Sequence, residues 1–270
     1  MSTALFSLVL LAGAPTTSTD ARPPSEAPPA VADLTRFLPR EDLERDGRRT
    51  LGQLPRNLGR SFTAVFARDS VAPLLIGTMT ASMAGFADTG TRSRLLGHAP
   101  SISNAASTAG GASFMLPATI GLFAAGRLSD GGRFRAFSYD ASQAVAVSFV
   151  YTHALKRMAG RTRPDGSNRL SFPSGHTSTA FAWATAAQAH YGWKGGVPSY
   201  AAATAIGLSR ITNDKHHLSD VIAGAAIGYV TGRAVLRANG EPVGRQKVFA
   251  LHPVSDAQGT GVGVGASLSW

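Results

Sequence analysis

Apolar residues along this chain gather in a series of alanine-rich segments that glycine, proline and charged residues separate. Within such a segment the apolar positions lie within helical reach of one another, as Val221, Ile222 and Ala225 do. The pattern predicts helices over residues 71–86, 113–127, 138–158, 176–191, 198–210 and 218–237. Because the pattern does not indicate a β-rich core, the predicted fold class is all-α, a helical bundle.

The segments on either side of these helices differ from them in composition and in the pattern of apolar residues. Residues 31–70 are rich in arginine and leucine and are broken by two prolines, which predicts short helices lying on a surface such as a membrane face. Residues 241–270 alternate between apolar and polar positions around the stretch SDAQG, which predicts a short β-hairpin. We therefore expect an N-terminal helical arm (31–70), a helical domain (71–240) and a C-terminal tail (241–270).

Residues 1–30 are typical of a targeting segment. The run LFSLVLLAGA, residues 5–14, has the length of a signal-peptide core and is short for a membrane span. A stretch rich in proline, serine and threonine follows it and predicts disorder. We expect export, with the protein periplasmic or membrane-associated, and an integral membrane protein is the alternative.

Composition narrows the classes of partner. The chain has 26 basic and 16 acidic side chains, a net charge of +10 that favours anions such as phosphates and lipid headgroups. Nucleic acid is not expected, because the basic residues do not form a dense block with interleaved aromatic residues. The chain has no cysteine, which excludes thiol catalysis and disulfides.

Two neighbouring segments carry polar groups that helix packing does not require. In KRMAGRTRPD, residues 156–165, Lys156 is one of only four lysines in the chain and stands seven residues before Arg163. In FPSGHT, residues 172–177, Ser174 or Thr177 is suited to cap a helix, and the amides of Gly175 and His176 are suited to hold an anion.

A third segment, SRITNDKHHLSD, covers residues 209–220. On a helix His216 and Asp220 share a face, so the carboxylate can hold Nδ1–H and present Nε2 outward. His217 is the less favoured histidine, and Arg210 adds an anion ligand. A metal site is the competing interpretation of His216 and Asp220, but the neighbouring basic residues, Lys215 among them, would repel a cation.

Together these groups suit phosphoryl transfer through a covalent intermediate. Cations and amides hold the phosphate oxygens as charge develops on them. One histidine attacks phosphorus, and the other protonates the leaving oxygen and then activates water.

The motifs K-x6-R-P, P-S-G-H and S-R-x5-H-x3-D, in this order, resemble the three-part signature of the type 2 phosphatidic acid phosphatase (PAP2) and vanadium haloperoxidase superfamily. The matching positions are Lys156, Arg163, Pro164, Pro173, Ser174, Gly175, His176, Ser209, Arg210, His216 and Asp220. The resemblance implies a bundle of about six core helices and a metal-independent phosphatase with a phosphohistidine intermediate, acting on phosphate monoesters or lipid (di)phosphates.

The resemblance also implies a role for each matching residue. His216 would be the nucleophile, Asp220 its orienting partner and His176 the acid. The residues that would bind phosphate are Lys156, Arg163, Ser174, Gly175 and Arg210. No metal or cofactor is expected; a vanadate-dependent haloperoxidase is the alternative, and the short chain between the motifs favours the phosphatase. The expected partner is a phosphorylated small molecule or a lipid, with contact at a membrane surface. The sequence does not indicate an oligomeric state.

Overall fold

The computed structural model of the chain describes residues 46–240, 248–255 and 262–269. Its elements are η2 (Leu51–Gln53), α2 (Leu54–Ala64), α3 (Arg68–Gly85), α4 (Asp88–Leu95), α5 (Pro100–Gly110), α6 (Ala112–Leu128), α7 (Gly132–Ala159), α8 (Gly175–Thr212), α9 (Leu218–Ala238), β1 (Val248–Ser255) and β2 (Val262–Ser269). The predicted all-α helical bundle is confirmed. The signal-like segment, 1–30, and the first part of the arm lie outside the described residues.

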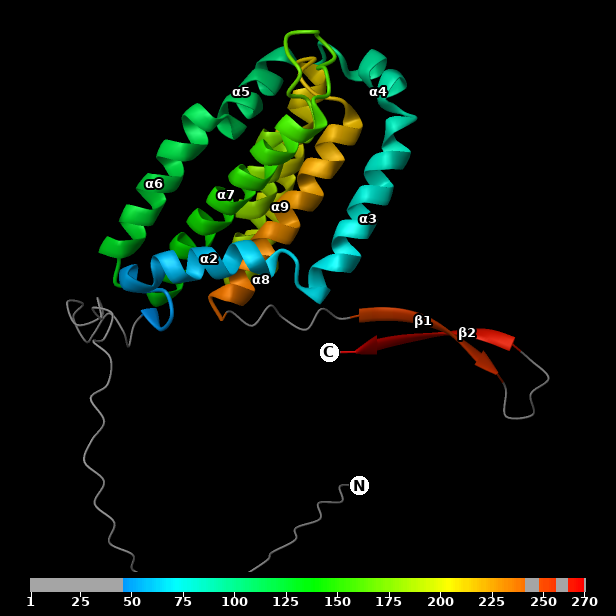
Figure 1. The fold of residues 1–270 in the computed structure, drawn as a ribbon. Coiled ribbons are helices and arrows are strands. Elements are labelled where there is room, and N and C mark those ends of the chain that lie inside the picture. The colour runs from blue at the N-terminus through cyan, green and yellow to red at the C-terminus, as the bar shows by residue number, and fades with distance from the viewer. Residues whose placement is uncertain (1–45, 241–247, 256–261, 270) are drawn as a thin grey trace, which may run out of the picture.

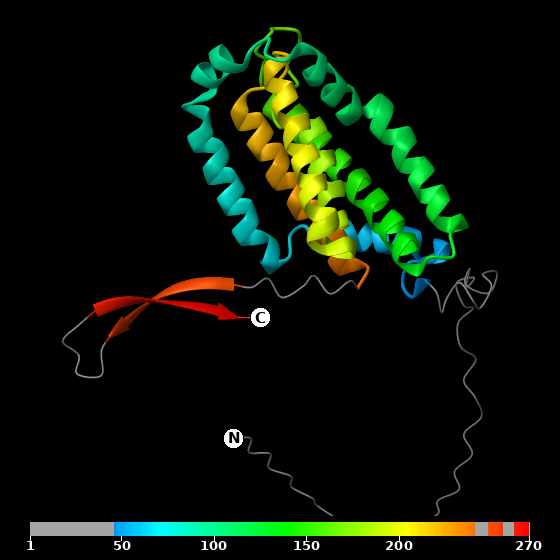
Figure 2. The same cartoon turned by 180° about the vertical axis from the view of Figure 1, so that it is seen from behind.

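Three helices, α7, α8 and α9, form the centre of the bundle (Figure 1). Helices α3 and α4 cover one flank, α5 and α6 cover the other, and α2 lies across one end, as the view from behind also shows (Figure 2). The active-site motifs all lie on the three central helices and on the loops at the end of the bundle away from α2.

Helix α8 is a hairpin of two antiparallel helices that turn at Gly192. This residue has φ 61° and ψ −150°, a conformation that only glycine adopts readily. The two halves then pack together: Thr185 Oγ1 and Tyr200 OH are 2.9 Å apart, although fifteen residues separate them in the chain. The reversal returns Arg210 to the end of the bundle where His176 begins the first half.

Helix α9 packs against the first half of α8 through a row of glycines. A Cβ atom on Gly224 would lie 2.6 Å from the carbonyl oxygen of Ser174, and one on Gly228 would lie 2.2 Å from that of Ser178. The two backbones therefore touch, as small residues at a helix interface permit. This contact places the first turns of α8 and α9 side by side, and Ser174 N donates to Asp220 O at 2.9 Å.

A buried polar network ties the far end of the bundle together. The carboxylate of Asp140, on α7, accepts two hydrogen bonds from Arg49 (3.0 and 2.9 Å). It also lies 2.8 Å from His190 Nε2 and accepts a hydrogen bond from Asn239 Nδ2 at 2.7 Å. Residues before α2 are thereby joined to α7, to α8 and to the residue that follows α9.

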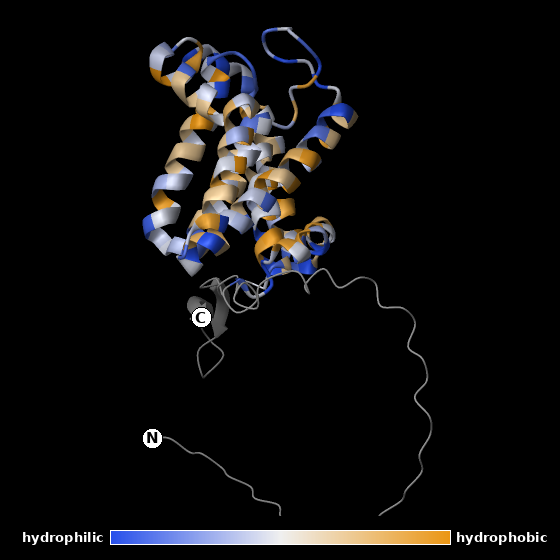
Figure 3. Ribbon diagram, turned by 90° about the vertical axis from the view of Figure 1, so that its left-hand side faces the viewer, coloured by the Kyte–Doolittle hydropathy of each residue, from blue (hydrophilic) through white to orange (hydrophobic). Residues whose placement is uncertain are grey.

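The outer surface of the bundle carries large apolar side chains. On α3, Ile76, Met79 and Met83 are each more than 60% exposed, and Ile120 on α6 is 70% exposed. Hydrophilic residues gather mostly at the two ends of the bundle (Figure 3). Helix α9 is long and apolar enough to cross a membrane, and the bent pairs α3–α4 and α5–α6 qualify if each is taken as one span. These features agree with membrane association.

The two C-terminal strands pair in antiparallel fashion, with Val248 opposite Ser269 and Ser255 opposite Val262. The connecting residues, 256–261, lie outside the described part of the chain. The strands follow the helical domain and contribute nothing to the cavity described below.

Replacing Gly192 with alanine tests the reversal in α8. A Cβ atom strains the backbone at positive φ, so we expect Gly192→Ala to lower the free energy of unfolding by roughly 1–3 kcal/mol. The matched control is Gly121→Ala in α6, where a Cβ atom meets nothing within 4 Å and alanine favours the helix by up to about 1 kcal/mol. Thermal unfolding compares the two, and equal melting temperatures would contradict the requirement for glycine.

Candidate active site

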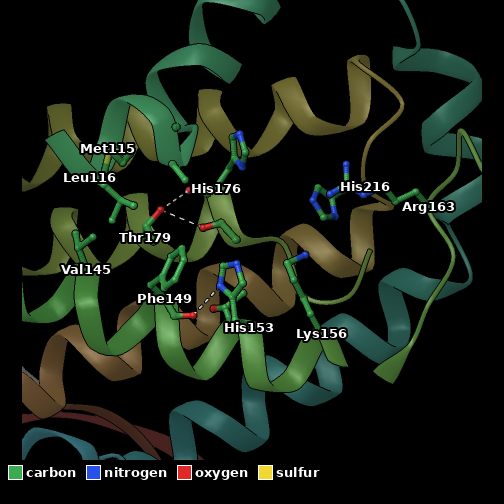
Figure 4. Close-up of a pocket in the computed structure, with 14 residues that line it drawn as sticks. Met115, Leu116, Val145, Phe149, His153, Lys156, Arg163, His176, Thr179 and His216 are labelled. Carbon is green, nitrogen blue, oxygen red and sulfur yellow. Dashed lines mark hydrogen bonds between the residues drawn. The ribbon is translucent and has the colours of Figure 1, made fainter. Parts of the chain in front are cut away.

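One cavity opens where α7 ends and where α8 begins (Figure 4). Polar and apolar groups line opposite parts of it. Its lining residues are Gly110, Ala112, Met115, Leu116, Val145, Phe149, Thr152, His153, Lys156, Arg163, Gly175, His176, Thr179 and His216. Five of the eight predicted site residues are in this set: Lys156, Arg163, Gly175, His176 and His216.

Lys156 and Arg163 reach the cavity from the end of α7 and from the loop that follows. Lys156 is 7% exposed, and its Nζ donates to the carbonyl oxygens of Leu170 (2.6 Å) and Ser171 (3.3 Å). Arg163 N donates to Asn168 O at 3.0 Å, which closes a small loop around the arginine. The buried Nε of Arg163 has no hydrogen-bond partner among the described residues. Both cations are thus held by backbone contacts while keeping donors free.

The N-terminus of α8 forms the opposite wall. Ser174 is the N-cap residue, but its hydroxyl makes no capping hydrogen bond and accepts one from Thr177 Oγ1 at 2.9 Å instead. The expectation that a hydroxyl closes this turn is therefore wrong. Because the first amides of a helix have no intrahelical acceptor, the N–H groups of Gly175 and His176 remain available for an anion.

Arg210 lies behind His176, on the returning half of α8. It is buried, it donates to Ser107 Oγ on α5, and its Nε has no partner among the described residues. Burial, together with the positive charge of Arg210, lowers the pKa of His176 to about 3. His176 is therefore neutral near pH 7.

His216 lies in the loop between α8 and α9 and is almost fully buried. Two ion pairs hold this loop: Arg92 on α4 with Asp214 (2.6 Å), and Lys215 with Asp165 (2.6 Å). Lys215 is therefore paired at the edge of the site and does not add to the charge inside the cavity, contrary to the sequence expectation.

His216 and Asp220 lie next to each other as predicted, but the local structure that brings them together differs from the predicted one. Helix α9 begins at Leu218, so the two residues do not share a helical face. Instead, His217 is the N-cap residue and its N–H donates to Asp220 Oδ2 at 2.9 Å. The fold of this cap brings Asp220 Oδ2 to 3.5 Å from His216 Nδ1, longer than a normal hydrogen bond.

Burial, together with the positive charge of Lys156, lowers the pKa of His216 to about 4, while the neighbouring carboxylate of Asp220 opposes the shift. His216 is therefore neutral near pH 7, and a neutral imidazole has a lone pair with which to attack.

Asp220 is held by residues that the sequence analysis did not select. Arg161 donates to Asp220 Oδ1 at 2.8 Å, and Ser171 Oγ donates to Oδ2 at 2.5 Å. Arg161 also donates to Asp88 Oδ2 at 2.8 Å, and Ser219 donates to Asp88 from both its N–H (2.9 Å) and its hydroxyl (2.7 Å). Asp88, on α4, thus completes a chain of alternating charges that ends at His216.

The donor set does not suit a metal ion. Within the described ranges no group of three or more His, Cys, Asp or Glu side chains could hold one. The other charged side chains that act on His216 and Asp220 include the cations Lys156, Arg161 and Arg210, which repel a metal. That the reaction needs no metal stays a prediction.

The sequence model of the PAP2 superfamily matches residues 139–242, which include every cavity residue from α7 onwards. This part of the chain belongs to the PAP2 superfamily. A curated relative, the lipid A 1-phosphatase of Porphyromonas gingivalis, is 47% identical over 83 residues. That match covers 30% of this chain and 19% of the relative, so the chain spans about a fifth of the relative's length.

Two solved PAP2 structures resemble this fold. The transmembrane PAP2-type phosphatidylglycerolphosphate phosphatase of Bacillus subtilis aligns with a TM-score of 0.55 and 19% identity, over 65% of this chain and 98% of its own. LpxE of Aquifex aeolicus aligns with a TM-score of 0.44 and 24% identity, over 51% of this chain and 85% of its own. The first likeness supports the helical PAP2 bundle and does not extend to a C-terminal hairpin.

Replacing Arg161 tests the network that holds Asp220 beside His216. Arg161→Ala leaves the buried carboxylates of Asp88 and Asp220 without their shared cation. We expect a loss of roughly 1–3 kcal/mol in the free energy of unfolding, reduced from the value for a fully buried pair because Arg161 is 35% exposed. The control is Arg157→Ala, an exposed residue one turn earlier, which should change stability by no more than about 0.5 kcal/mol. Equal melting temperatures for the two variants would contradict a structural role for Arg161.

Proposed function

We propose that this PAP2 protein is a metal-independent phosphatase that hydrolyses phosphate monoesters or lipid (di)phosphates through a phosphohistidine. The observation that carries the proposal is the cavity in which Lys156, Arg163 and the amides of the α8 N-terminus surround the space between His176 and His216. Fixed donors on three sides of such a space fit a phosphoryl group and its transition state.

The proposed first step transfers the phosphoryl group to the enzyme. Lys156, Arg163 and Arg210 hold the nonbridging oxygens together with the amides of the α8 N-terminus. His216 Nε2 attacks phosphorus, an N–P bond forms, and the P–O bond to the leaving group breaks. Asp220 stabilises the positive charge that develops on the His216 ring.

His176 supplies the proton that the leaving oxygen requires. The empty cavity keeps His176 neutral, but a bound phosphate dianion adds negative charge beside the ring and raises its pKa. The protonated ring then donates to the leaving group. In the second step neutral His176 takes a proton from water, the oxygen attacks phosphorus, and the N–P bond breaks to release phosphate.

The apolar part of the cavity supports a lipid as substrate. Met115 and Leu116 on α6 and Val145 and Phe149 on α7 continue the cavity away from the cations. Leu116 and Val145 also line a second, largely apolar cavity between α2, α6 and α7. A molecule with a phosphate at one end and a hydrocarbon chain at the other fits this order of surfaces.

The known relatives and the surface point to the same substrate class. The matched relative is named a lipid A 1-phosphatase, and the aligned Bacillus subtilis enzyme is a phosphatidylglycerolphosphate phosphatase. The exposed apolar surface of α3 and α6 provides contact with lipid, where such substrates reside. We infer that the enzyme works at a membrane, and export to the periplasm stays part of the proposal.

The first test compares His216→Ala with His98→Ala, a change at an exposed histidine outside the site. We expect the His216 variant to lose hydrolysis of p-nitrophenyl phosphate and of phosphatidate, because the nucleophile is gone, while the His98 variant keeps it. Both assays contain EDTA. Wild-type turnover by His216→Ala would refute the nucleophile, and loss of wild-type activity in EDTA would refute metal independence. Bromide oxidation that requires vanadate would favour the haloperoxidase.

A pH profile tests how His216 is activated. His216 must be neutral to attack, so kcat/KM of the wild-type should fall as pH drops through about 4, the pKa of this histidine. Asp220 raises that pKa, so Asp220→Asn should move the acid limb to lower pH while kcat falls by about a hundredfold. Both proteins are assayed with the same substrate, so the ionisation of the substrate affects the two pH profiles equally. An acid limb that moves to higher pH in the variant would contradict this arrangement.

A further inference from the structure

His153 is a polar side chain of the cavity to which the proposed mechanism gives no role. It lies on α7, three residues before Lys156 and four after Phe149, and its ring faces the space between Lys156 and His176 (Figure 4). It is not part of any of the three motifs. Its position, between the phosphate-binding groups and the apolar part of the cavity, suggests contact with the leaving group.

The orientation of the His153 ring is fixed by its own helix. Nδ1 lies 2.9 Å from the carbonyl oxygen of Phe149, and since a carbonyl only accepts, Nδ1 carries the hydrogen. The ring also stacks on Phe149, with centroids 3.9 Å apart and planes tilted by 32°. In the neutral ring this leaves Nε2 as an acceptor, directed at the cavity and held there before any ligand arrives.

The hydroxyl groups near His153 are already engaged in bonds within the protein. Thr152 Oγ1 pairs with Ser178 Oγ at 2.8 Å, and Thr179 Oγ1 donates to Gly175 O at 3.0 Å. The hydrogens of these hydroxyl groups are thus in use, whereas His153 offers a ring nitrogen, fixed in position, as an acceptor for a group lying between the cations and the apolar side chains.

The order of residues along α7 sets the distance from the phosphate. A rise of about 1.5 Å per residue places His153 about 4.5 Å, and Phe149 about 10.5 Å, from Lys156 along the helix axis. When Lys156 holds the phosphate of a substrate, the substrate atoms two or three bonds beyond the ester oxygen thus lie beside His153. The hydrocarbon part of the same molecule then lies beside Phe149 and Val145.

We propose that His153 determines specificity for the leaving group: its Nε2 accepts a hydrogen bond from a hydroxyl carried on the carbon next to the phosphate ester. This inference rests on the proposed phosphatase function and adds to it the chemistry of the group that leaves. His153 touches no reacting atom, so its effect is on the choice among phosphate esters.

The test uses two single-chain lipid phosphates of equal chain length. One is a lysophosphatidate with a free hydroxyl on the glycerol carbon next to the phosphate ester, and the other has hydrogen in place of that hydroxyl. The ratio of kcat/KM for the two substrates is measured with the full chain in detergent micelles, at one pH above the acid limb. The variants are His153→Leu, His153→Gln, which keeps an acceptor, and the exposed control His98→Leu.

We expect the wild-type and His98→Leu to prefer the hydroxyl substrate by about three- to tenfold, the value of one hydrogen bond. The ratio should fall to about one in His153→Leu and stay partly preserved in His153→Gln. Reduced folding in a variant lowers both rates together and leaves the ratio intact. An unchanged ratio in His153→Leu, or a wild-type ratio of one, overturns the role of His153 while the phosphatase stands. If the wild-type hydrolyses neither lipid but still hydrolyses p-nitrophenyl phosphate, this inference fails and the phosphatase stands. If it hydrolyses none of the three, the proposed function fails and this inference fails with it.

Discussion

The geometry of the whole site depends on the hydrogen bonds that converge on Asp220. Its side chain accepts from Arg161, from Ser171 and from the backbone of His217, and its carbonyl accepts from Ser174 N. These contacts join the loop after α7, the N-terminus of α8 and the start of α9 at one residue. Each of those segments carries a group proposed to bind phosphate or lies next to a histidine of the site, so the relative positions of these groups are set before a ligand binds.

Positive charges cluster at the cavity, and groups that lie outside the cavity stabilise them. Lys156 and Arg163 line the cavity and Arg210 lies behind it, and burial, together with the charges of Lys156 and Arg210, lowers the pKa of both histidines. Backbone carbonyls hold Lys156, and the carboxylates of Asp88 and Asp220 lie behind the histidine. The repulsion among these cations costs free energy, and a bound dianion offsets that cost. The arrangement therefore favours tight binding of the phosphoryl group in the transition state.

Most of the helices and part of the candidate site could be predicted from the sequence, because they depend on local sequence patterns. Apolar spacing predicted α3, α6, α7, α9 and both halves of α8, and the three motifs supplied five of the cavity residues, among them both cations and the two histidines proposed to react. The sequence did not reveal α4 or α5, where serine, threonine and glycine leave no apolar period. Asp88 could not be found either, since its link to Asp220 spans more than a hundred residues and depends on how α4 packs. Arg161 was visible two residues before Arg163, but only the fold shows that it turns away from the cavity.

The network of Arg49, Asp140 and Asn239 has a consequence for the topology of the chain. It ties both ends of the helical domain to the end of the bundle away from the cavity, and Gly240 packs beside Arg48 there. Between that end and the cavity lies the apolar surface of α3 and α6. If lipid covers this surface, the two ends of the helical domain and the mouth of the cavity face different aqueous compartments. A protease confined to one side could then reach only one of the two.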